Sequence, residues 1–247
     1  MVGITDPSVL KFKMLFYLTD FSNPVLSETE SQHIVKVLRK VKGDWIEVTD
    51  GLGNRANAQI EDAHHKHCRL SLISPTHHER PWKSQHWLGI APTKNLDRME
   101  WLVEKATEVG CNGFLFFRSK RTERDQLNLE RLQKVAVAAM KQSGQNWLPE
   151  IMWVPKWELF PWKQFDQIYL ADLEVEEKKE LLKSDPGKGK SIWMIGPEGD
   201  FTPEERQTLK EHLAIPVSLG PTVLRTETAA LYSLVQAHVL SRIDQFN

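Results

Sequence analysis

The chain has 247 residues, and its 32 lysines and arginines nearly balance its 33 aspartates and glutamates, so that the formal net charge is −1. This balance excludes a strong overall basic field, and nucleic-acid binding would have to come from a local patch. The two cysteines argue against a disulfide framework, and no apolar run or N-terminal pattern indicates a membrane span or a secretory signal. We therefore expect a soluble, cytoplasmic protein without a membrane partner.

The pattern of apolar residues in 1–78 predicts a small domain that is rich in β-strands. Strands are expected at residues 15–18, 45–49, 55–60 and 68–73. Between the first two strands, Ser27 and Glu30 form a capping box that opens a helix. The apolar stripe of this helix would consist of Ile34, Val37, Leu38 and Val41. Short strands at this spacing favour a small barrel.

Histidines gather in two places of this first domain and could be read as metal ligands. The side chains in question are His64, His65, His67, Cys68, His77 and His78. Their spacing matches no familiar zinc pattern, and the first group falls in a polar turn between two strands. We therefore predict a solvated loop and no metal site.

A linker is expected at residues 77–82. The pattern of residues 82–247 then predicts a second domain, in which strands and helices alternate. Strands are expected at residues 87–91, 114–117, 151–154, 167–171, 191–195 and 216–219. Helices are expected at residues 96–109, from 129 to about 143, at 174–183, from 203 onward and at 226–243. This alternation predicts an α/β fold with a parallel sheet that is covered on both faces.

Two glycine-bearing loops follow the last two predicted strands. Residues 196–201 lead into a helix start with Thr202 at the N-cap and Glu205 at the third helical position. Gly220 and Pro221 end the other strand, and Thr226 is predicted to be the N-cap of the last helix. Because ligands of open α/β sheets bind outside the carboxyl ends of the strands, both loops are expected to face one crevice.

The strings Ile195-Gly-Pro-Glu-Gly199 and Leu219-Gly-Pro-Thr-Val-Leu-Arg-Thr-Glu-Thr-Ala229 resemble the cofactor-binding loops of the SPOUT class of RNA methyltransferases. More narrowly, the chain is similar to the RsmE family, which methylates N3 of a uridine in small-subunit (16S) ribosomal RNA. The resemblance implies a PUA-like RNA-binding barrel at residues 1–78 and a SPOUT domain with a trefoil knot at 82–247. It also implies S-adenosyl-L-methionine as the cofactor, the small ribosomal subunit as the partner, and a homodimer. The knot loops would lie near residues 170–173, 195–200 and 219–226.

Arg225 and Glu198 are assigned to catalysis. A guanidinium is a poor neighbour for the cationic sulfur of the cofactor, and it suits the negative charge that grows on uracil as N3 loses its proton. Glu198 and Glu227 are the carboxylates available as general base. Glu227, in the first turn of the last helix, is more typical of a partner of the helix dipole, and Glu198 is therefore preferred.

The residues expected at the cofactor supply either close backbone approach or apolar surface for the adenine. They are Leu170, Ile195, Gly196, Gly199, Leu219, Gly220, Leu224, Thr226 and Ala229. Taken singly, each aliphatic residue is more typical of ordinary core. Local basic clusters are expected to contact RNA phosphates through Arg39, Lys40, Arg55, Arg118, Lys120, Arg121 and Arg124.

Two positions depart from the family pattern. Asp200 stands where a second glycine often follows, and aspartate tolerates a left-handed backbone better than most residues. Gln145 stands where the family commonly has arginine, so one phosphate contact is missing from the pattern.

Other readings of the chain remain open. They are a non-catalytic RNA-binding protein with a degenerate SPOUT module, and a SPOUT methyltransferase that acts on another RNA. The intact segment 224–228 argues against degeneracy. A nucleotide-cofactor oxidoreductase is disfavoured, because no Gly-x-Gly-x-x-Gly follows the first strand of the second domain.

Overall fold

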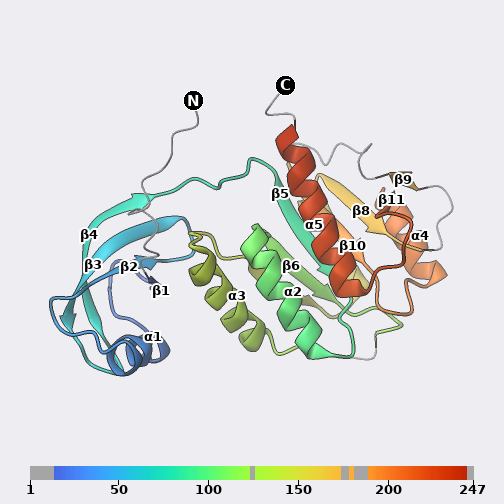
Figure 1. Cartoon of the computed structure of the whole chain (residues 1–247). Coiled ribbons are helices and arrows are strands. Elements are labelled where there is room, and N and C mark those ends of the chain that lie inside the picture. The colour runs from blue at the N-terminus through green and yellow to red at the C-terminus, as the bar shows by residue number, and fades with distance from the viewer. Residues whose placement is uncertain (1–13, 123–125, 174–177, 181–188, 244–247) are drawn as a thin grey trace. The chain divides into compact units, whose positions relative to one another are not determined.

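The computed structural model describes residues 14–122, 126–173, 178–180 and 189–243 (Figure 1). The chain divides into two compact units, and each is described by itself. Unit 1 consists of Met1–Arg80 together with Met140–Trp147, and unit 2 of Pro81–Ala139 together with Leu148–Asn247.

Unit 1 contains a four-stranded sheet. Its strands are β1 (Leu15–Tyr17), β2 (Trp45–Thr49), β3 (Asn54–Asp62) and β4 (Arg69–His77), in that spatial order. β1 runs parallel to β2, and the other pairs are antiparallel. Side chains of alternate residues, among them Val48, Ala58 and Leu70, are buried in one apolar core. The four strands predicted from the sequence are confirmed.

The helical part of unit 1 differs from its prediction. α1 (Glu28–Gln32) begins where expected, because the Ser27 hydroxyl accepts a hydrogen bond from the Glu30 amide at 3.3 Å. It continues as a π-helical turn, η2 (His33–Val37). Ile34 is buried, but Val37 and Val41 are 68% and 61% exposed, so the predicted apolar stripe is wrong for these two valines. A π-turn adds a residue to the helical repeat and so rotates the side chains that follow off the 3.6-residue period.

Unit 2 is built on a seven-stranded sheet in which every strand pairs with its neighbours in parallel. Its spatial order is β7 (Glu150–Val154), β6 (Gly113–Phe117), β5 (Gln85–Ile90), β10 (Lys190–Ile195), β8 (Gln167–Ala171), β11 (Ile215–Ser218) and β9 (Lys179–Glu180). The predicted parallel sheet is confirmed. The helix predicted at 174–183 is wrong at Lys179–Glu180, which is strand, and its other residues apart from Lys178 lie outside the described part of the chain.

Both faces of this sheet are covered, as the sequence predicts. α2 (Leu96–Val109) and α5 (Thr226–Ile243) lie side by side on one face, together with α3 (Leu129–Ser143) (Figure 1). α4 (Pro203–Glu211) and the short helices η3 (Trp157–Leu159) and η4 (Trp162–Gln164) contribute to the core of the other face. Successive residues of β10 alternate between the two cores, with Trp193 in the first and Met194 in the second.

The strand order brings three loops together. β8 lies between β10 and β11, and all three strands run in the same direction. The segments that follow these strands therefore leave the sheet at the same edge. The trefoil knot stays a prediction of the resemblance.

The helices that begin at this edge start in different ways. α4 has the predicted capping box, in which the Thr202 amide donates to the Glu205 carboxylate at 2.8 Å and the Glu205 amide donates to the Thr202 hydroxyl at 3.3 Å. α5 begins at Thr226 itself, and the Arg225 carbonyl accepts from the Ala229 amide at 2.7 Å. The predicted N-cap role of Thr226 is therefore wrong. Its hydroxyl instead donates to the Gly196 carbonyl at 3.1 Å and so ties the two glycine-bearing loops together.

Candidate active site

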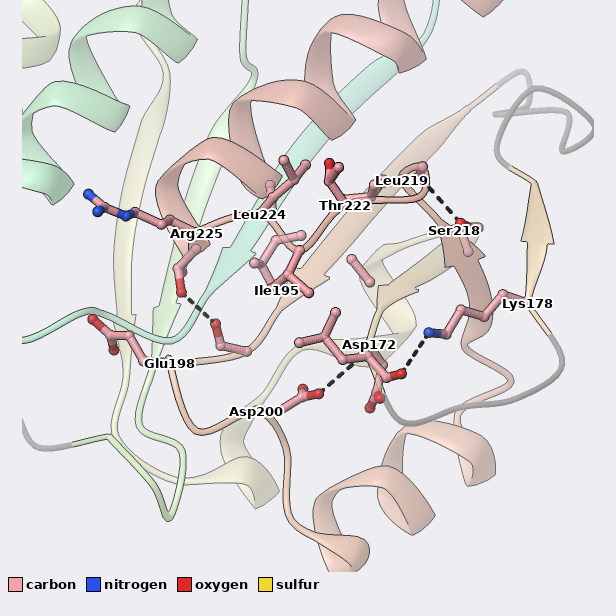
Figure 2. A pocket seen from close by; sticks show the side chains of 18 of the residues that line it. Asp172, Lys178, Ile195, Glu198, Asp200, Ser218, Leu219, Thr222, Leu224 and Arg225 are labelled. Atoms are coloured by element: carbon pink, nitrogen blue, oxygen red, sulfur yellow. Dashed lines mark hydrogen bonds between the residues drawn. The ribbon is translucent and has the colours of Figure 1, made fainter.

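A cavity of about 310 Å³ lies at the carboxyl ends of β8, β10 and β11 (Figure 2). Most of the residues assigned to a cofactor from the sequence line it, and so do Arg225 and Glu198. The lining cofactor residues are Ile195, Gly196, Leu219, Gly220, Leu224, Thr226 and Ala229. One cavity therefore brings together the two loops that the sequence singled out and the segment after β8.

Leu170 and Gly199 do not line this cavity. The Leu170 side chain is buried in the core on the α4 face of the sheet. The Gly199 carbonyl accepts a hydrogen bond from the Arg121 guanidinium, and a Cβ at Gly199 would lie 3.3 Å from the Arg121 side chain. Gly199 therefore shapes the loop from outside the cavity.

The apolar part of the cavity is formed by aliphatic side chains from both loops. Ile195 lies near the middle of the side chains drawn in Figure 2, and Leu224 lies above it at the start of α5. Gly196 allows its loop to pack closely against the Phe201 ring, because a Cβ at Gly196 would lie only 3.1 Å from that ring. Gly220 adopts a φ of +123°, which favours glycine, and a Cβ there would meet nothing within 4 Å.

Asp172 and Asp200 form the opposite wall, where both lie close to Arg206. Arg206 donates to the fully buried Asp172 carboxylate at 2.6 Å and lies 3.4 Å from Asp200. Asp200 adopts a φ of +59°, so the predicted left-handed conformation is confirmed. Its carboxylate accepts hydrogen bonds from the amides of Leu173 at 3.1 Å and Phe201 at 2.8 Å.

Burial raises the pKa of the Asp200 carboxyl, and the two backbone hydrogen bonds oppose this shift. Asp172 and Asp200 both line the cavity together with Lys178, which donates to the Leu173 carbonyl at 2.9 Å. Asp172 could not be found from local pattern, because its partner lies on a helix 34 residues further along the chain. Of these two carboxylates only that of Asp200 is partly exposed, with 14% of its side chain accessible, whereas that of Asp172 is buried in its ion pair with Arg206.

Charged side chains also stand at the rim. Arg225 is exposed, its side chain points away from the cavity in Figure 2, and no described residue pairs with its guanidinium. Arg98, on α2, lies 3.9 Å from the Glu198 carboxylate and 3.7 Å from that of Glu227. Glu227 is buried in the first turn of α5, and its Oε2 has no hydrogen-bond partner among the described residues.

Arg98 thus connects both carboxylates that the sequence offered as general base. This arginine could not be predicted from the sequence, because it lies in an ordinary amphipathic helix and carries no motif. Glu198 is the more accessible of the two acids, with 52% of its side chain exposed against 10% for Glu227. This exposure agrees with the preference for Glu198.

The basic residues assigned to RNA in unit 1 have different surroundings. Arg39 is exposed, and Lys40 lies 3.9 Å from Asp44. Arg55 is held inside the unit, because it pairs with Glu47 and donates to the Gly144 carbonyl at 3.2 Å. Arg39 and Lys40 therefore suit an RNA contact better than Arg55.

The basic residues assigned to RNA in unit 2 also include both exposed side chains and side chains that are held by hydrogen bonds within the unit. Arg118 and Lys120 are exposed, and Lys120 forms an open ion pair with Glu204 at 3.7 Å. Arg121 donates to the carbonyls of Gly199 and Phe201 and so supports the loop after β10. Arg124 lies outside the described residues.

Of the histidines considered as metal ligands, His64, His65 and His67 lie in the polar turn between β3 and β4, whereas His77 is the last residue of β4 and His78 follows it. The rings of His64 and His67 stack with centroids 3.7 Å apart. In the described part of the chain, no group of three or more His, Cys, Asp or Glu side chains is arranged to hold a metal ion. No helix within the same residues is long and apolar enough to cross a membrane.

Both units of the chain match known protein families. Residues 80–238 match the RNA methyltransferase domain, and residues 26–73 match the RNA methyltransferase PUA domain. The chain is 30% identical over 219 residues to the ribosomal RNA small subunit methyltransferase E of Bacillus subtilis (strain 168), and the match covers 83% of this chain and 85% of that protein. The protein of the same name from Synechocystis is also 30% identical, with coverages of 87% and 72%.

Solved structures agree with these matches. A probable rRNA-methyltransferase from Porphyromonas gingivalis is 35% identical, with a TM-score of 0.83 over 93% of this chain and 99% of that chain. A protein from Legionella pneumophila, solved with the bound cofactor SAM, is 25% identical, with a TM-score of 0.80 and coverages of 92% and 97%. The resemblance read from the two loop strings therefore extends over nearly the whole chain.

Proposed function

Because the chain belongs to the RsmE family of ribosomal RNA methyltransferases, we propose that it transfers a methyl group from S-adenosyl-L-methionine (SAM) to N3 of a uridine in 16S ribosomal RNA. The proposal rests on the cavity, whose walls include the two glycine-bearing loops that carry the resemblance to the family. We further propose that the assembled small subunit is the substrate and that the protein acts in the cytoplasm.

The residues of the cavity fit SAM in size and chemistry. A volume of about 310 Å³ falls within the range of sites for small ligands. Ile195 and Leu224 offer apolar surface to an adenine. On the opposite wall, the partly exposed Asp200 carboxylate suits a cofactor that is cationic at sulfur, whereas the charge of Asp172 is paired with Arg206. SAM supplies an activated methyl group when it is bound.

The rim residues would act on the uracil. Neutral N3 is a weak nucleophile and must lose its proton before it can accept a methyl group. In the proposed mechanism the Glu198 carboxylate takes this proton, while the Arg225 guanidinium stabilises the uracil anion. Arg98 holds Glu198 and Glu227 at the rim through its two ion pairs. Holding the acceptor in line with the methyl group lowers the barrier further.

Analysis of the RNA product tests the proposal directly. Small subunits from a strain that lacks the protein are incubated with the purified protein and isotopically labelled SAM, and digested 16S RNA is analysed by mass spectrometry. We expect one 3-methyluridine, which is also missing from the RNA of the mutant strain. A methyl group on C5 or on a ribose would contradict the N3 assignment, and faster methylation of naked 16S RNA would contradict the assembled substrate.

Replacing Gly220 by valine is expected to weaken SAM binding at least tenfold. The reason is conformational, since a valine cannot adopt the φ of +123° at Gly220 without strain. The loop from Leu219 to Arg225 would then shift at the cavity wall. A valine side chain would also add bulk at the cavity wall, because Gly220 lines the cavity and a Cβ there would meet nothing within 4 Å.

Calorimetric titration with SAM measures this effect. Gly144→Val is the matched control, because Gly144 also has a positive φ, of +70°, and open space around its Cβ, but lies outside the cavity. Unchanged SAM affinity in Gly220→Val, or an equal loss in the control, would contradict the assigned role of the loop.

We also propose a homodimer that is formed through α5. Tyr232, Val235 and Val239 are 44%, 38% and 50% exposed and share one face of this helix. Burying such a stripe against its symmetry copy would remove it from water.

Light scattering is expected to give twice the mass of one chain. The Val235→Glu variant is expected to shift the protein toward the monomer. The control Leu213→Glu alters an apolar residue that is 83% exposed outside α5 and should leave the mass unchanged. A wild-type monomer at micromolar concentration would refute the proposal.

A further inference from the structure

Residues 36–45 of unit 1, called the 36–45 segment below, expose apolar and basic side chains together. Its exposed apolar residues are Val37, Val41 and Trp45, with exposed fractions of 68%, 61% and 52%. Its basic residues are Lys36, Arg39, Lys40 and Lys42, against one acidic residue, Asp44. In a chain whose net charge is −1, this segment is a local positive patch with apolar surface inside it.

The backbone of the segment holds these side chains outward. The π-turn closes with a hydrogen bond from the Leu38 amide to the His33 carbonyl at 3.0 Å. Arg39 then adopts a φ of +54°, a left-handed conformation that is sterically unfavourable for an arginine. Strained residues of this kind, like π-turns, gather at functional sites.

The turn that follows is fixed from both sides. The Asp44 carboxylate accepts a hydrogen bond from the Val41 amide at 3.0 Å, and the Asp44 amide donates to the Val41 carbonyl at 3.1 Å. The Gly43 amide donates to the Ile60 carbonyl of β3 at 2.8 Å. The exposed side chains therefore stand on an ordered backbone, which lowers the entropy cost of binding.

Trp45 is the first residue of β2 and points to the open face of the sheet. The next residue, Ile46, is buried, and the cross-strand neighbour of Trp45 is the neutral Gln59. Within the described residues, no aromatic ring or cation stacks on the Trp45 indole, and Lys36, Arg39 and Lys42 have no ion-pair partner. The indole and these three cations are thus available to a ligand.

We propose that the 36–45 segment binds a single-stranded part of the RNA substrate, with an unpaired base stacked on Trp45 and phosphates at Lys36, Arg39 and Lys42. The inference rests on the function proposed above and names the part of the RNA that unit 1 contacts. The positive charge of the patch complements a polyanion. An exposed tryptophan in a segment that also carries exposed cations is typical of sites for single strands, because a duplex does not expose the faces of its bases.

The test compares tryptophan variants of the full chain in binding to small subunits. Trp45→Leu keeps apolar bulk and removes the ring, and we expect its dissociation constant to rise about tenfold to a hundredfold, the usual loss when one base–aromatic stack is removed. Trp45→Phe keeps a ring and should lose less than about threefold. The matched control is Trp101→Leu, which alters a tryptophan of α2 that is 41% exposed. It should bind like wild type.

Salt dependence separates stacking from charge. Lys42→Ala should reduce the slope of log K against log salt by about 0.7, the value for one phosphate of a single strand, whereas Trp45→Leu should leave the slope unchanged. Equal binding by wild type and Trp45→Leu, or equal losses in Trp45→Leu and Trp45→Phe, would overturn the inference. If wild type binds subunits without methylating N3, the proposed function fails and the binding comparison still decides the role of Trp45.

Discussion

Replacing Arg225 by alanine is expected to lower the single-turnover rate of methylation about a hundredfold, while the affinity for SAM changes less than about threefold. The cofactor is cationic at its sulfur, and Arg225 therefore gains nothing from approaching it. Its natural partner is the uracil, where negative charge grows as N3 loses its proton. An interaction that is made mainly in the transition state lowers the rate when it is removed and leaves ground-state binding nearly unchanged.

The position of Arg225 supports this separation of rate from binding. The residue lies at the rim, its side chain is exposed and points away from the cavity, and no described residue pairs with it (Figure 2). Removing the guanidinium should therefore leave the fold intact. Arg225→Lys keeps the charge but loses the planar fork of donors, and we expect it to recover only part of the rate.

Calorimetric titration of SAM and rapid-quench methylation of small subunits measure the two quantities on the same variant. Arg131→Ala is the control, because Arg131 also has an exposed side chain but pairs with Glu100 outside the cavity. It should change neither value. Equal losses of SAM affinity and rate in Arg225→Ala would instead identify Arg225 as a structural clamp of its loop.

The free energy of unfolding is expected to fall by about 3 kcal/mol between pH 6.5 and pH 5, because two buried histidines must stay neutral in the folded protein. His86 and His238 are 0% and 5% exposed, and their ring centroids lie 5.0 Å apart. His86 Nδ1 lies 2.8 Å from the Ser191 hydroxyl oxygen, whereas neither ring nitrogen of His238 has a hydrogen-bond partner among the described residues.

Burial lowers the pKa of His86 to about 3, with a contribution from the charge of His238, and burial lowers the pKa of His238 to about 4. In the unfolded chain both would titrate near 6.5, so the unfolded state takes up protons first as the pH falls. The stability is therefore complete above pH 6.5 and is lost as the pH falls toward these folded-state values. Each histidine contributes a slope that approaches about 1.4 kcal/mol per pH unit below pH 6.5, or about 1.6 kcal/mol between pH 6.5 and pH 5.

Urea unfolding at several pH values between 7.5 and 5 measures this slope. His238→Phe removes one of the two titrating groups and should reduce the slope by about half. His67→Asn is the matched control, since His67 lies exposed in the loop between β3 and β4 and should leave the slope unchanged. A slope in His238→Phe equal to that of wild type would show that the acid sensitivity arises elsewhere.

Much of the fold follows from local features of the sequence. Apolar runs bounded by glycine and proline predict β10 and β11, and the spacing of Thr202 and Glu205 predicts the start of α4. Such features act over a few residues, because hydrophobic periodicity and capping depend on neighbours along the chain. The carboxyl-end rule for parallel strands then predicts that the two loops meet, as the cavity confirms.

Long-range partners were decided only by the tertiary structure. Thr226 has the residue type of an N-cap, but its hydroxyl donates to Gly196, 30 residues away in the chain. Arg55 and Arg121 have the charge of RNA-binding residues, yet each is turned toward carbonyl groups of its own unit. Arg98 and Asp172 carried no motif, and they form the ion pairs that shape the rim and the wall of the cavity. A sequence pattern specifies which residues are polar or buried, whereas the partner that satisfies a charge depends on which distant segments the folded chain brings within a few ångströms.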